Sequence, residues 1–123
     1  MEKNMRKLFL FLMISIFVIG CAQTSHSVMG TAIDPANVQT IEKNVTTADQ
    51  ITQKFGAPMN KAMTDGGEIW TYMYMDTQGT TGLTSTQVSG KQQKLDVMIK
   101  DGVVVNYTYN EGPIAMQGTG SWY

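Results

Sequence analysis

The stretch LDVMIKDGVVVNY, residues 95–107, carries the strongest folding signal in the chain. It places Asp101-Gly102 between two runs of strand-forming residues, which is the sequence pattern of a tight β-hairpin. A two-residue turn at this position sets Ile99 opposite Val104. We therefore predict an antiparallel hairpin over residues 91–110, with its turn at Asp101-Gly102.

The two faces of this hairpin differ in polarity. One face is entirely apolar and is assigned to the core; it carries Leu95, Val97, Ile99 and Val104. The other face mixes apolar with charged side chains and is the candidate surface for a protein partner; its apolar members are Met98, Val105 and Tyr107. A single β-bulge would exchange the two faces, because successive side chains of a strand point to opposite sides.

Two helices are predicted before the hairpin. Segment 45–58 has Thr46 or Thr47 as its helix cap, and Gly56 and Pro58 end the helix. A shorter helix opens at Asp34-Pro35 and stops near Asn44. The apolar stripes expected to face the sheet are Ala48, Ile51 and Phe55 in the longer helix and Val38, Ile41 and Val45 in the shorter one.

The segment EIWTYMYMD, residues 68–76, is rich in aromatic and other strand-forming residues and predicts one more strand. The element order is then helix, helix, strand, strand, strand. The predicted fold class is α+β, with two N-terminal helices packed on a three-stranded antiparallel β-sheet (ααβββ) in two layers.

The first 20 residues have the organisation of a secretory signal peptide. Lys3, Arg6 and Lys7 supply a positive start, and residues 8–19 are apolar apart from Ser15. A bilayer-spanning helix needs about 20 apolar residues, so this run is too short to cross a membrane. Segment 1–20 is therefore expected to be removed from the mature protein.

The single cysteine follows this run directly. Val18-Ile19-Gly20-Cys21 resembles the processing site of bacterial lipoproteins, in which the cysteine thiol attacks as a nucleophile and becomes lipidated. Cys21 is the predicted lipidation site, and acyl chains such as palmitate would anchor the protein to a membrane. The alternative is a secreted protein with an incidental cysteine. Ala22 is not the aspartate that often retains such lipoproteins in the inner membrane, which favours the outer membrane, with the domain in the periplasm.

The expected organisation has four parts. They are the signal peptide 1–20, a lipidated flexible tether 21–32 that includes His26, an α+β domain 33–110, and an irregular C-terminal tail 111–123. Inside the domain, the polar segment 77–90 is predicted to be a long loop, either mobile or in contact with a partner. The terminal Trp122-Tyr123 pair folds back, is disordered, or docks on a partner.

The order of these motifs resembles the small outer-membrane lipoproteins of the SmpA/OmlA (BamE-like) family, over roughly residues 38–108. The matching residues are Thr46-Thr47, Ile51, Phe55-Gly56-Ala57-Pro58, Trp70, Tyr72, and the alternating run from Leu95 to Val104. The chain departs from the family at Asn44, where glycine is frequent, and in its short first helix. The resemblance implies a helix pair before a three-stranded sheet, an envelope location and a role through protein contacts.

Catalytic chemistry has few candidates in this sequence. The one histidine lies in the expected tether and the one cysteine is the expected lipidation site, so no nucleophile–base pair remains. No enzymatic activity, cofactor or metal is predicted. After residue 20 the chain keeps six lysines and nine carboxylates, a balance that argues against nucleic-acid binding.

Three classes of function remain open. The first is a lipid-anchored, non-enzymatic binding module at the outer membrane that helps assemble or maintain an envelope protein complex, with another envelope protein as partner. The second is a lipoprotein encoded by a plasmid or phage that modifies or blocks a cell-surface process. The third is a Cu(I) binder that uses the spacings Met59-x-x-x-Met63 and Met73-x-Met75.

Overall fold

The computed structural model describes residues 1–16 and 22–119 of the 123-residue chain. The described part contains three helices and five strands. The helices are α1 (Glu2–Ile16), α2 (Pro35–Gln39) and α3 (Ala48–Phe55), and the strands are β1 (Gln23–Gly30), β2 (Asn60–Thr64), β3 (Gly67–Thr81), β4 (Ser85–Lys100) and β5 (Val103–Thr119).

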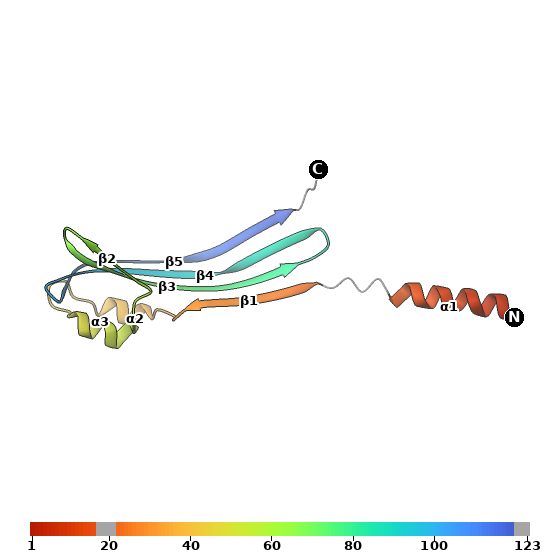
Figure 1. Ribbon diagram of the computed structural model, residues 1–123, viewed down its shortest axis with the longest axis horizontal. Helices are drawn as coiled ribbons and strands as arrows, with labels where there is room; N and C mark the ends of the chain where they lie inside the picture. Colours follow the sequence, from red (N-terminus) through yellow and green to blue (C-terminus); the bar gives the residue numbers. More distant parts are fainter. Residues whose placement is uncertain (17–21, 120–123) are drawn as a thin grey trace.

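All five strands belong to one antiparallel sheet, with the order β1-β3-β4-β5. β2 pairs with β3 on the same edge as β1. β2 lies along the start of β3, Gly67 to Thr71, and β1 lies along its later part, Tyr74 to Thr81. Figure 1 shows α2 and α3 on one face of this sheet, gathered at one end of the long strands. The far half of the sheet has no helix over it.

The predicted ααβββ fold with a three-stranded sheet is wrong. Two further strands, β1 and β2, occupy the edge of β3. β1 lies in the expected tether 21–32, and β2 lies between the predicted helix 45–58 and the predicted strand 68–76. The helices are short, with five residues in α2 and eight in α3. The protein is therefore mainly β, and the two short helices form a small layer that covers only one end of the sheet.

The polar segment 77–90 is a pair of strand extensions and not a loop. Thr77 to Thr81 continue β3, and β4 begins at Ser85. The connection is a tight turn at Leu83-Thr84, where the Gly82 N–H donates to the Ser85 carbonyl at 2.9 Å. Threonine favours strands, and pairing on both sides of β4 satisfies the backbone polar groups that a loop would leave to water.

The expected tail is also paired. β5 continues to Thr119, and Thr119 lies opposite Ser85. The tether interpretation fails in the same way, because Gln23 to Gly30 form β1 against β3. Sequence reasoning missed all three extensions, since these polar, glycine-containing segments lack the apolar alternation that marks a half-buried strand.

The core lies between the helices and the near half of the sheet. Its buried side chains are Ile33, Val38, Ile41, Ile51, Trp70, Tyr72, Leu95, Val97, Ile99 and Val104. The apolar hairpin face is thus confirmed as core, and Ile99 pairs with Val104 as predicted. Val45 was expected in the stripe of the first helix, but α2 ends at Gln39 and Val45 is 62% exposed.

The caps of α3 are as predicted. The Thr47 hydroxyl accepts a hydrogen bond from the Gln50 N–H, and the Gln50 side chain accepts one from the Thr47 N–H, which together form a capping box. Gly56 ends the helix with a φ of 78°. The start of α3 pairs with the hairpin turn: Thr47 forms a β-bridge with Val103, and the Ala48 N–H donates to the Gly102 carbonyl at 2.9 Å. The helix start is therefore fixed to the end of the β4–β5 hairpin.

Candidate functional site

The structure does not bring the three predicted partner-surface residues onto one face. Met98 pairs with Asn106 and Ile99 pairs with Val104, so Val105 is the extra residue of a β-bulge. Beyond this bulge the strand changes phase, and Tyr107 pairs with the buried Val97. Tyr107 packs against the core cluster on the helix side, whereas Met98 lies on the opposite face.

The helix-free side of the near half of the sheet, here called the open face, carries several methionines. Met98 lies opposite Ile69, and Met29 lies opposite Met75. Met73 is two residues from Met75 and therefore points to the same face. Met29 is 45% exposed, and the others are half-buried although no helix covers them. Methionine side chains are flexible and polarizable, which suits an adaptable contact surface.

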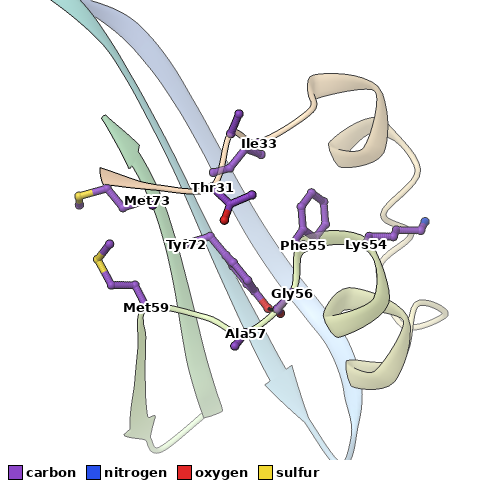
Figure 2. A pocket seen from close by; sticks show the side chains of 11 residues that line it. Thr31, Ile33, Lys54, Phe55, Gly56, Ala57, Met59, Tyr72 and Met73 are labelled. Atoms are coloured by element: carbon purple, nitrogen blue, oxygen red, sulfur yellow. Dashed lines mark hydrogen bonds between the residues drawn. The ribbon is translucent and has the colours of Figure 1, made fainter. Parts of the chain in front are cut away.

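A cleft lies at the edge of the sheet, where β1 and β2 leave a gap on β3. β1 pairs with β3 as far as Tyr74, and β2 begins opposite Thr71, so Tyr72 and Met73 stand between them. The cleft has a volume of about 440 Å³. Figure 2 shows its lining from both layers: Gly30, Thr31, Ala32, Ile33, Lys54, Phe55, Gly56, Ala57, Met59, Tyr72 and Met73.

The walls of this edge cleft are aromatic and aliphatic side chains together with backbone groups. The rings of Phe55 and Tyr72 lie 5.7 Å apart, and the Tyr72 hydroxyl donates to the Gly56 carbonyl at 3.1 Å. Burial raises the pKa of Tyr72 to about 12, so this hydroxyl stays protonated at neutral pH. Among the described residues that line the cleft none is acidic, and its one lysine, Lys54, donates to the Thr40 hydroxyl. Such walls can hold an apolar side chain but offer no acid–base pair.

The four methionines singled out by their spacing do not all lie on the same face of the sheet. Met63 lies opposite Glu68 on the helix side of the sheet, and it is 76% exposed. Figure 2 shows the sulfur-bearing ends of Met59 and Met73 turned to the same side, away from α3. Within residues 1–16 and 22–119, no group of three or more His, Cys, Asp or Glu side chains is placed to hold a metal ion.

Gln93 has a structural role that the sequence did not suggest. It is 5% exposed, its side-chain oxygen accepts from the Ile33 N–H at 3.0 Å, and its amide nitrogen donates to the Ile33 carbonyl at 2.8 Å. The same nitrogen donates to the Tyr109 hydroxyl at 2.9 Å. Gln93 thus joins the segment after β1 to β4. Its only signal in the sequence is a position two residues before Leu95, in phase with the core face.

His26 is the second residue with an unexpected contact. The sequence predicts that it lies in a flexible tether, but its Nε2 lies 2.7 Å from the Asp76 carboxylate across β1 and β3. Both side chains are partly exposed, so this pair contributes little to stability.

The predicted lipidation site, Cys21, lies outside the residues that the structure describes, as do Trp122 and Tyr123. Within the described ranges, no helix has the length and apolar character needed to cross a bilayer. Comparisons with protein-family models, curated proteins and solved structures found no match. What this chain does is therefore inferred from its own residues and geometry.

Proposed function

We propose that this chain is a lipid-anchored, non-enzymatic protein-binding module of a bacterial outer membrane, which helps assemble or maintain an envelope protein complex. The observation that carries the proposal is the short distance along the chain between Cys21, at the end of the lipoprotein-like processing site, and Gln23, the first residue of β1. With acyl chains on Cys21, the sheet itself is held at the membrane, without a flexible tether. The resemblance of the sequence motifs to SmpA/OmlA lipoproteins is a second ground for this proposal.

The open face is the surface we assign to the protein partner. It keeps Met98 from the sequence-based prediction and adds Ile69, Met73, Met75 and Met29. These side chains lie on one face with no helical layer above it, and the Lys94–Asp96 ion pair separates Ile69 and Met98 from the other methionines. The edge cleft begins beside Met73. A partner that covers these side chains would remove apolar surface from water. Each Å² of apolar surface removed contributes roughly 25 cal/mol of favourable free energy.

Site-specific crosslinking in intact cells tests this assignment. A photoreactive amino acid replaces Met98 on the open face, and the matched control carries it at Gln53, an exposed position of α3. We expect one dominant crosslinked protein from position 98 and none from position 53. Equal adducts at both positions, or no adduct at position 98 with several crosslinkers, would contradict a partner on this face.

A further inference from the structure

Charged residues are absent from one end of the sheet. The far half, here called the distal end, consists of residues 22–28, 77–90 and 112–119. None of these three segments contains Asp, Glu, Lys or Arg, although every other segment of the described chain after residue 21 carries both signs of charge. His26 is the only titratable side chain in them. Long paired strands without charges are unusual on a surface that faces only water.

The same end exposes apolar side chains. Leu83, at the β3–β4 turn, is 94% exposed. Val28 and Met116 on the neighbouring strands are 54% and 65% exposed. Because the Gly82 N–H donates to the Ser85 carbonyl, the turn is closed by the backbone and presents Leu83 outward. The turn therefore has an apolar side chain at its tip and neutral polar residues around it.

Three chain segments end together at this tip. Gln23 lies opposite Thr81, and Ser85 lies opposite Thr119. Figure 1 shows the start of β1, the β3–β4 turn and the end of β5 at the end of the sheet farthest from α2 and α3. Two residues span at most about 7 Å, so a lipid on Cys21 would enter the bilayer close to Gln23 and to the turn.

We propose that the distal end is a membrane-contact surface, which rests its Leu83 turn on the phospholipid bilayer that holds the Cys21 acyl chains. This inference rests on the proposed lipid anchor and adds the orientation of the domain. An uncharged end can approach the interface without desolvating an ion, which is the largest cost of such an approach. Leu83 would enter the boundary between headgroups and acyl chains, as exposed apolar side chains of interfacial proteins do.

This orientation places the helical end away from the lipid. β3 has 15 residues, which at about 3.3 Å per residue corresponds to a length of about 50 Å. The near half of the sheet, with Met98 and the edge cleft, would then stand in the periplasm well above the headgroups. The open face would meet a partner there instead of lipid.

Fluorescence of the full-length acylated protein tests the contact. Leu83→Cys and, as the matched control on α3, Gln53→Cys are each labelled with an environment-sensitive fluorophore. The proteins are reconstituted in vesicles of phosphatidylethanolamine and phosphatidylglycerol that contain a headgroup nitroxide lipid as quencher. The unsubstituted protein shows whether Cys21 is acylated, because a thioether takes up no thiol reagent.

We expect blue-shifted emission at position 83 and at least threefold stronger quenching there than at position 53. Equal quenching at the two positions of an acylated protein would overturn the membrane contact and leave the proposed function standing. A change at position 83 that follows protein concentration and not the nitroxide would indicate self-association and would also overturn it. Labelling of Cys21 in the unsubstituted protein would overturn the lipid anchor and this inference together.

Discussion

At the scale of single residues, Gln93 shows how one polar side chain can join two parts of the fold. Its amide forms the pair of hydrogen bonds with Ile33 that a neighbouring strand would otherwise supply. No buried side-chain nitrogen or oxygen in the described chain lacks a hydrogen-bond partner, and Gln93 is part of that balance. A polar residue in phase with the core face of a strand predicts such a contact only when its partner is known. The contact could not be predicted here because Ile33 is 60 residues away in the sequence.

Tyr72 gives a pH-dependent prediction at the same scale. Burial raises its pKa from 10.0 to about 12, so the folded state holds the phenol proton more tightly than the unfolded state does. The stabilisation is fully present below pH 10 and is lost as pH rises through about 12. We expect the free energy of unfolding to fall by about 2–3 kcal/mol across this window, at 1.36 kcal/mol per pKa unit, in alkaline denaturant titrations.

Tyr72→Phe is the control for this titration. It keeps the ring beside Phe55 but loses the hydrogen bond to the Gly56 carbonyl, which costs about 0.5–1.5 kcal/mol at pH 7. The alkaline loss of stability should then become smaller. The pKa of Tyr109 is also raised, chiefly by burial and then by Glu111. Because Tyr109 is present in both proteins, its contribution to the alkaline loss is the same in each. An alkaline loss of the same size in the Phe variant would contradict the assignment to Tyr72.

At the scale of elements, the strands are longer than the sequence indicates because each one completes its neighbour. β4 is paired on both sides from Thr86 to Ile99, so its polar half is held by backbone hydrogen bonds and not by apolar packing. The bulge at Val105 then decides which tyrosines reach the core. Neither effect leaves a local sequence signal, whereas the caps of α3 and the Asp101-Gly102 turn depend on neighbouring residues alone and were predicted correctly.

Gly90 supplies a prediction for the polar half of β4. A Cβ atom at this position would lie 2.0 Å from the Asp76 carbonyl oxygen and 2.9 Å from the Thr77 Cα, so β3 and β4 could not keep their spacing. We expect Gly90→Ala to lower the free energy of unfolding by about 1–3 kcal/mol, as overpacking does, in thermal or denaturant unfolding.

Gly112 provides the matched control, because a Cβ atom there meets nothing within 4 Å and its φ is not positive. Gly112→Ala should change stability by no more than about 1 kcal/mol. If Gly90→Ala were as well tolerated as Gly112→Ala, the close approach of β3 and β4 at Thr77 would be incorrect.

At the scale of the whole molecule, the proposed lipid anchor on Cys21 makes a prediction about the mass of the native protein. We expect the protein purified from membranes of its native host to have the mass of residues 21–123 plus its acyl chains, and Cys21→Ser to remain uncleaved without them, because only a thiol accepts the lipid. Intact-mass spectrometry measures both. A native product with a free thiol, or one that retains residues 1–20, would refute the anchor.

The sequence by itself determined the local features: the Asp101-Gly102 hairpin, the apolar face from Leu95 to Val104, and the start and end of α3. Each depends on side chains within a few residues, where turn geometry, alternation and capping act directly. Only the tertiary structure decided the five-stranded sheet, the strands at 23–30 and 111–119, and the separation of Met98 from Tyr107. Those features depend on backbone pairing between distant segments, and polar strands that are stabilised by their neighbours carry no hydrophobic pattern of their own.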